Sequence, residues 1–130
     1  MNPSSEDIKD VLLDSNLSLV FGANLFIGKQ PNQPDQCVTI YDTPGFAPQM
    51  NFNQQERYNY PSIQIRVRAV TYLIGYQVIN DIKMILHGVA QQIINETTYT
   101  VVQCMGDPSF LEWDEKGRVN FIINFNLQRR

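Results

Sequence analysis

The sequence has little charge, little histidine and cysteine, and no long apolar run. Its 130 residues include 10 Lys and Arg against 13 Asp and Glu, which gives a net charge of −3. Sequence-independent DNA binding needs a broad positive surface, so this balance argues against a free nucleic-acid-binding protein. No apolar run approaches the roughly 18 residues of a membrane span, and the polar, acidic start MNPSSED is unlike a secretory signal. We expect no membrane partner and a chain that stays in the compartment where it is made.

The scarcity of histidine and cysteine also limits the chemistry. His87 is the only histidine, so a Ser-His-Asp triad or a Cys-His dyad would have to include it. It stands at the predicted end of a helix, where the helix dipole favours it without any catalytic role. We expect no catalytic residue and buried free thiols at Cys37 and Cys104. A small acyl-transfer or hydrolytic enzyme that pairs one of these thiols with His87 is the remote alternative.

Metal and nucleotide sites lack the residues they need. A structural zinc site takes about four nitrogen or sulfur ligands, and the chain has one His and two Cys. None of its 7 glycines belongs to a GxxxxGK[ST] or GxGxxG motif, which are the common phosphate-binding loops. We therefore expect neither a metal nor a cofactor.

The sequence is rich in amide side chains and poor in charged ones. Asn and Gln together make up 24 of the 130 residues, while charged residues are only 18%, below the roughly 25% of an ordinary soluble domain. A surface that forms hydrogen bonds without charge suits packing against other protein. The composition favours a subunit of an assembly, although amide-rich monomers also exist.

Two helices are predicted. The first covers residues 4–13, with Ser4 or Ser5 as its N-cap and acidic residues in its first turn. The second runs from about residue 71 to residue 88, where Gly88 can supply a left-handed C-cap. Its apolar residues recur every three to four positions and predict the buried face: Ile74, Val78, Ile82, Ile85 and Val89.

Six strands complete the predicted fold. Alternating apolar residues, clearest in the third and sixth segments, place them at residues 25–28, 37–41, 62–69, 99–105, 110–113 and 118–127. Residues 114–117 join the last two as a hairpin turn. The order α-β-β-β-α-β-β-β indicates one α+β domain over residues 1–130, with both helices on one face of a mainly antiparallel sheet.

Residues 43–61 are predicted to form a long loop. They contain three prolines, several aromatic residues and only two charges, Glu56 and Arg57. Loops longer than about 12–15 residues are usually functional or disordered, so we expect this one to be mobile in the isolated chain and ordered by neighbouring subunits or another protein of the same assembly. A loop folded back over its own sheet is the alternative. Arg66 and Arg68 project from one face of the following strand and could bind phosphate or an acidic partner, although solvated strand residues are the more common explanation for such a pair. The predicted interface residues are Phe46, Phe52, Arg57, Tyr58, Tyr60, Arg66 and Arg68.

Several segments carry a resemblance to a known family. They are residues 35–45 (DQCVTIYDTPG), 60–69 (YPSIQIRVRA), 107–111 (DPSFL) and 114–118 (DEKGR), the last leading into the strand that ends the chain. In their order and spacing they resemble the tail terminator or minor capsid proteins of long-tailed bacteriophages. The stretch before Asp35 adds little to this resemblance.

The resemblance implies a structural virion protein rather than an enzyme. Such a protein forms a ring, commonly a hexamer, that caps the tail tube where it meets the head. Its implied partners are further copies of itself, the tail tube protein and the head-completion or neck proteins, with genomic DNA passing through the ring without sequence-specific binding. It would be assembled in the host cytoplasm and end in the virion neck. A head-completion or stopper protein of the same virion is the nearer alternative.

Overall fold

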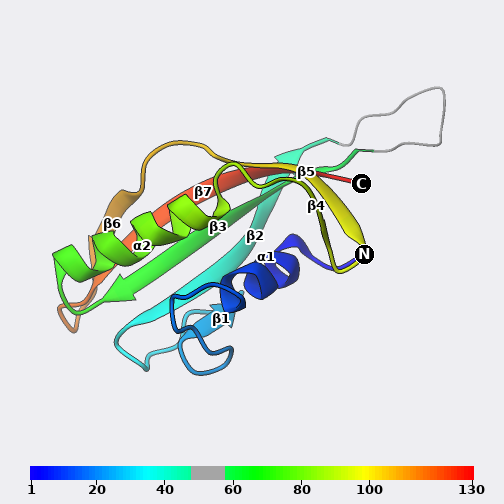
Figure 1. Ribbon diagram of the computed structural model, residues 1–130. Helices are drawn as coiled ribbons and strands as arrows, with labels where there is room; N and C mark the ends of the chain where they lie inside the picture. Colours follow the sequence, from blue (N-terminus) through cyan, green and yellow to red (C-terminus); the bar gives the residue numbers. More distant parts are fainter. Residues whose placement is uncertain (48–57) are drawn as a thin grey trace.

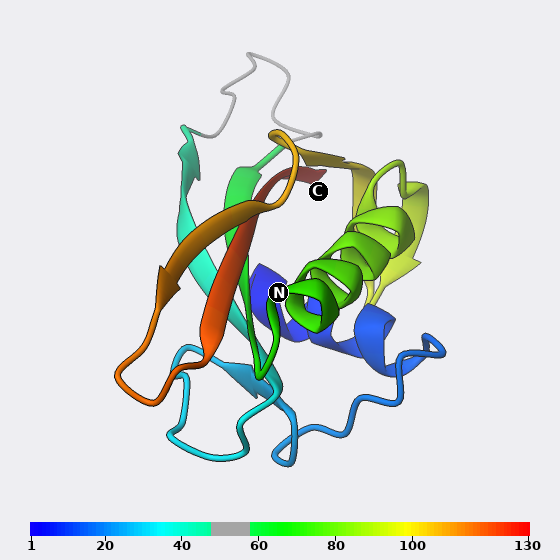
Figure 2. The same ribbon diagram turned by 90° about the vertical axis from the view of Figure 1, so that its left-hand side faces the viewer.

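The computed structural model describes residues 1–47 and 58–130 and has two layers (Figure 1). One layer is a sheet, and the other contains the helices α1 (Ser4–Leu13) and α2 (Tyr72–Leu86), which lie on the same side of it (Figure 2). The strands are β1 (Leu25–Ile27), β2 (Cys37–Phe46), β3 (Tyr60–Ala69), β4 (Ala90–Ile94), β5 (Thr97–Cys104), β6 (Ser109–Trp113) and β7 (Val119–Arg129). The predicted α+β class, the order of the elements and the placement of both helices are confirmed.

β7 organises the sheet, whose strand order is β1-β2-β3-β7-β5-β4 with β6 also paired to β7. One edge of β7 pairs with β3, while the other edge pairs first with β6 and then with β5. Among the described strands, only β1 and β2 pair in parallel. Strand β4 was not expected from the sequence, because four of its five residues are exposed and give no apolar alternation.

The core lies between the sheet and the helices. Alternate residues of β3 and β7 face it, and Ile65, Val67, Phe121 and Phe125 are all at most 1% exposed. Of the predicted face of α2, Ile82 is buried and Val78, Ile85 and Val89 are partly buried against the core, whereas Ile74 is 40% exposed. The buried residues of the helix are Gly75, Ile79, Ile82 and Leu86, so the centre of the buried face lies about one position from the predicted one. The helix turns this face inward because Gly75, which has no side chain, lets it approach β7 closely.

α1 begins differently from the prediction. Pro3 occupies the N-cap position and makes no side-chain cap bond, so neither Ser4 nor Ser5 is the N-cap. The amide and hydroxyl groups of Ser5 instead donate to the Asp42 carboxylate on β2, at 3.0 and 2.6 Å. A charged acceptor makes the stronger hydrogen bond, which explains why the serine ties the helix to the sheet rather than capping it.

The predicted loop over residues 43–61 is shorter at both ends. β2 continues to Phe46 through a register shift after Thr43, and β3 already begins at Tyr60. Pro44 is tolerated there because it lies within this register shift, between the pairs Thr43–Ser62 and Phe46–Tyr60, where it takes part in no strand pairing. Phe52 and Arg57 lie outside the described residues.

Candidate interaction surfaces

The aromatic cluster is a group of five rings at the end of the molecule where α2 begins. Its members come from α2, β6 and β7 and are Tyr72, Tyr76, Phe110, Trp113 and Phe121. The Tyr72 ring lies 4.8 Å from the Phe121 ring in an edge-on arrangement, and 6.0 and 6.5 Å from the rings of Phe110 and Trp113. These separations fall in the range that aromatic pairs favour.

Local backbone features bring these rings together. A register shift between Phe110 and Glu112 interrupts the pairing of β6 with β7, and both Phe110 and Trp113 contact Tyr72. Such bulges commonly re-aim side chains at sheet edges. On the helix, Gly75 makes room for the Phe121 ring, because a Cβ built there would lie 2.9 Å from two atoms of that ring. The cluster is therefore held by the fold itself.

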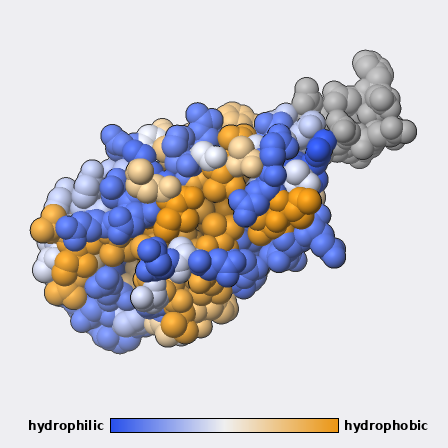
Figure 3. Space-filling view, viewed as in Figure 1, coloured by the Kyte–Doolittle hydropathy of each residue, from blue (hydrophilic) through white to orange (hydrophobic). Residues whose placement is uncertain are grey.

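Most of the aromatic cluster is open to solvent. Phe121 is buried, but Tyr72, Tyr76, Phe110 and Trp113 are 51, 42, 44 and 50% exposed. Figure 3 shows further hydrophobic surface at this end of the molecule. A contiguous exposed apolar group of this kind marks an interaction site more often than a structural one.

The aromatic cluster was not predicted from the sequence. The tyrosines at positions 72 and 76 stand four residues apart on a predicted helix, a spacing that places them on one face. That signal was available, but the contribution of β6 depends on its pairing and its bulge, which the sequence does not reveal.

The β2 tip, residues 43–46, is a second exposed feature. Phe46 is 67% exposed, and a Cβ added to Gly45 would lie 1.8 Å from the Tyr60 carbonyl oxygen. Only glycine allows this close crossing over β3, so the backbone that carries Phe46 is fixed. β1 pairs with β2 only at Val38, Thr39 and Ile40, and no described strand covers the outer edge of β2 beyond them.

The remaining predicted interface residues have mixed positions. Tyr58 is half-buried, and its hydroxyl accepts a hydrogen bond from Arg130 at 3.3 Å. Tyr60 is also half-buried. Arg66 lies on the face of the sheet away from the helices, where it stacks 5.2 Å from the Tyr41 ring and donates to Gln64 at 3.3 Å.

Arg68 does not lie with the exposed residues. It is 3% exposed, and its guanidinium donates to the carbonyl oxygens of Pro34 and Asp35 at 2.6 and 3.2 Å. The turn between β1 and β2 crosses this end of β3 and supplies those acceptors. Arg68 therefore stabilises the fold, and we remove it from the interface.

The helix-free face of the sheet carries paired polar side chains. Ser62 donates to Asn126 at 2.7 Å, and Gln64 donates to Asn124 at 3.2 Å, both between β3 and β7. These hydrogen bonds satisfy amide groups that would otherwise have to bond to water. Three of the amide side chains thus serve cross-strand pairing rather than the surface alone.

The polar junction joins the two chain termini at the end opposite the aromatic cluster. The fully buried Asp7 of α1 accepts hydrogen bonds from the Tyr99 hydroxyl and from Asn95. Arg129 donates to the same hydroxyl at 3.1 Å and to the Asn2 carbonyl at 2.8 Å. Burial, together with the bond to Asp7, raises the pKa of Tyr99 to about 12. The junction locks α1 to β5 and β7.

The geometry does not form the pairs that the enzyme alternative requires. His87 Nδ1 accepts from the backbone amide of Cys104 at 3.1 Å, and neither thiol among the described residues hydrogen-bonds to the imidazole. Burial raises the pKa of the Cys37 thiol, which disfavours a reactive thiolate. Within residues 1–47 and 58–130, no group of three metal-binding side chains is present, and no helix is long and apolar enough to cross a membrane.

Comparison with known proteins identifies the family. A chain in a solved structure of the virion of a native gene transfer agent particle has the same fold, with a TM-score of 0.67 and 10% sequence identity over 94% of this chain and 90% of that one. No curated protein sequence matches. Residues 12–130 match the family described as bacteriophage tail terminator protein, so the match starts well before Asp35. The chain belongs to the bacteriophage tail terminator family.

Proposed function

We propose that the protein forms a closed ring, a hexamer, at the head-proximal end of the phage tail tube and joins the tube to the head. The observation that carries this proposal is the match of residues 12–130 to the tail terminator family. A structural role agrees with the exposed aromatic cluster, because a contiguous group of exposed apolar side chains is typical of an interaction surface. We expect no catalytic turnover, no bound metal and no cofactor.

The proposed partners are other copies of the chain, the tail tube protein and a head-completion or neck protein. The net charge of −3 suits a passage through which genomic DNA moves without being bound. Subunits would be made in the host cytoplasm and incorporated into the virion neck. Of the interface residues predicted from the sequence, we retain Phe46, Phe52, Arg57, Tyr58, Tyr60 and Arg66.

Localisation in the particle tests this proposal. A phage lacking the gene is complemented with an epitope-tagged chain, and gold-labelled antibody is imaged on purified virions by electron microscopy. We expect the label at the neck, and we expect tails assembled without the protein to end irregularly, because nothing caps the growing tube. A tag placed after Met1 and a tag placed after Arg130 serve as matched controls for interference by the epitope.

The same images separate the alternatives. Label on the capsid shell or on the tail tip would overturn the assignment. Tails of normal length and appearance that fail only to join heads would point instead to a head-completion or stopper protein. Averaged images of the labelled necks, viewed along the tail axis, count the subunits and test the hexamer directly.

A further inference from the structure

We infer that the aromatic cluster of one subunit binds the β2 tip of a second copy of this chain, so that copies join head to tail. This contact rests on the ring proposed above and assigns the two surfaces that form it. Its parts are the half-exposed rings of Tyr72, Tyr76, Phe110 and Trp113 on one subunit and Phe46 on the next.

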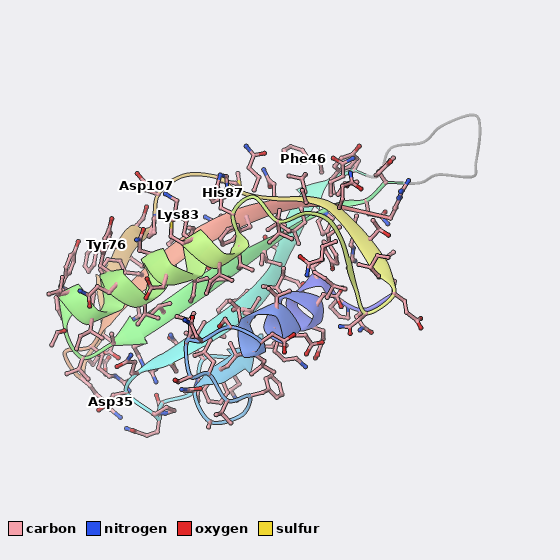
Figure 4. All side chains as sticks on the ribbon, viewed as in Figure 1. Asp35, Phe46, Tyr76, Lys83, His87 and Asp107 are labelled. Carbon is pink, nitrogen blue, oxygen red and sulfur yellow. The ribbon has the colours of Figure 1, made fainter. Side chains whose placement is uncertain are left out.

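The two surfaces cannot meet within one chain. Phe46 and Tyr76 lie at opposite ends of the molecule (Figure 4). Phe46 is 67% exposed, and the rings of the cluster are 42–51% exposed. A second copy of the chain can supply an apolar partner for either surface, because every copy carries both surfaces in equal number.

The chemistry of the two surfaces is complementary. A phenylalanine ring inserted among four rings can form the edge-on contacts that aromatic side chains favour. None of the four exposed cluster rings carries a formal charge at neutral pH, and neither do Pro44, Gly45 and Phe46. Their burial therefore carries no penalty for removing a charge from water.

Both surfaces are also fixed before they meet. The close crossing of Gly45 over Tyr60 sets the backbone next to Phe46, and the Phe121 ring under Gly75 supports the cluster from below. Rigid surfaces lose less conformational entropy on binding, which raises affinity for a given contact area. Aromatic anchors on such supports are typical of the residues that dominate binding energy.

The contact is heterologous because its two halves differ. Each added subunit leaves one free β2 tip and one free aromatic cluster, until a suitable rotation between neighbours closes the chain of subunits into a ring. The outer edge of β2 beyond Ile40, which no described strand covers, lies beside the tip and can receive backbone from the same neighbour.

Photo-crosslinking in intact virions tests this contact. Leu73, 65% exposed and one helical turn from Tyr76, is replaced by the photo-crosslinker p-benzoylphenylalanine in the complementing chain. Irradiation should link copies of the 15.0 kDa chain into a ladder, and mass spectrometry should place the linked site within residues 43–46 of the second copy. The matched control carries the crosslinker at Ile93 of β4, 71% exposed, and should give no such product.

A second pair of variants tests the role of Phe46. Phe46→Ser in the chain with the crosslinker at position 73 should lower the linked fraction about tenfold or more, while the unfolding temperature of the purified chain stays unchanged. Ile93→Ser, a change at a similarly exposed position, should leave the linked fraction unchanged.

The outcomes separate this contact from the ring itself. A ring at the neck whose crosslinks reach the tail tube protein, a head protein or another segment of the second copy would overturn the contact and leave the proposed function standing. A ring at the neck with no crosslink from position 73 would do the same. Failure of the chain to localise to the neck would overturn the proposed function.

Discussion

The two ends of this molecule differ in which side chains they bury and which they expose. At the end where the termini meet, the polar junction of Asp7, Tyr99 and Arg129 is closed off from solvent, and Asp7 and Tyr99 are both fully buried. At the other end, four of the five rings of the aromatic cluster remain 42–51% exposed. Groups that prefer water are buried at one end, while groups that avoid water are exposed at the other.

This difference distinguishes the contacts that stabilise the subunit from the surface that is available for assembly. Buried polar groups persist where every partner is present in the same chain, because an unpaired one costs about 1–3 kcal/mol. The exposed rings are not covered by any of the described residues, so another molecule can bury them. The polar junction therefore stabilises the subunit, and the aromatic cluster is available to a neighbour.

The largest expected effect is at Phe121, which belongs to both the core and the aromatic cluster. Phe121→Ala should lower the free energy of unfolding by about 3–5 kcal/mol, through lost burial and the cavity that remains. Denaturant unfolding of the purified chain measures this change. A loss below about 1 kcal/mol would show that this ring supports only the surface and that the face is not core.

The polar junction should make stability depend on alkaline pH. Tyr99 ionises near pH 10 when unfolded but has a pKa of about 12 in the folded chain, so its stabilisation is complete below pH 10 and is lost as the pH rises toward 12. The loss should reach about 2–3 kcal/mol, measured by denaturant unfolding across this range.

Tyr99→Phe is the control for that pH dependence. It should be about 1–3 kcal/mol less stable at neutral pH, because the buried Asp7 loses a hydrogen-bond donor. It should also lose less of its remaining stability between pH 10 and pH 12 than the natural chain. Parallel losses in the two chains would show that the hydroxyl of Tyr99 is not the group responsible.

A substitution at Gly75, which lies against the Phe121 ring of the aromatic cluster, should have a smaller effect on the free energy of unfolding. Alanine in place of glycine usually stabilises a helix by about 1 kcal/mol, but at Gly75 the new Cβ would lie 2.9 Å from the Phe121 ring and 3.3 Å from the Ala69 Cβ. Overpacking costs about 1–3 kcal/mol, so Gly75→Ala should be destabilised by about 0–2 kcal/mol in thermal or denaturant unfolding once the helix gain is subtracted.

A matched substitution and a spectroscopic signal sharpen that test. Gly88→Ala changes a glycine with φ +91° that has no atom near its missing Cβ, so any loss there comes from backbone strain alone. Trp113, the only tryptophan, should change its fluorescence in Gly75→Ala but not in Gly88→Ala. A more stable Gly75→Ala chain with unchanged fluorescence would contradict the close approach.

The smallest expected effect on stability is at the exposed rings. Tyr76→Ser should cost less than about 1 kcal/mol in denaturant unfolding, because the ring is half-exposed and makes one ring contact, with Phe121. The same variant should nevertheless reduce the yield of infectious particles in complementation. A loss of stability as large as that of Phe121→Ala would place Tyr76 in the core and remove the contrast between the two ends.

Much of the fold follows from local pattern. Alternation of apolar residues located β3 and β7 with their buried faces, because a strand repeats every two residues and each of these strands has one covered face. The turn residues before β7 and the helical period after residue 71 placed the neighbouring elements to within a few positions. β4 gave no such signal, since exposed edge strands need no apolar alternation.

The α+β class, the order of the elements and the absence of the common motifs for catalysis, metal binding and phosphate binding can be read from the residues alone, because these depend on residue type and short spacing. Which exposed residues lie together depends instead on how the chain folds. Tyr72 and Trp113 are 41 positions apart in the chain yet their rings lie 6.5 Å apart, and Arg68 is buried by a turn that precedes it by more than 30 positions. Contacts of this kind depend on strand pairing, bulges and crossing segments, which bring together residues that no local pattern connects.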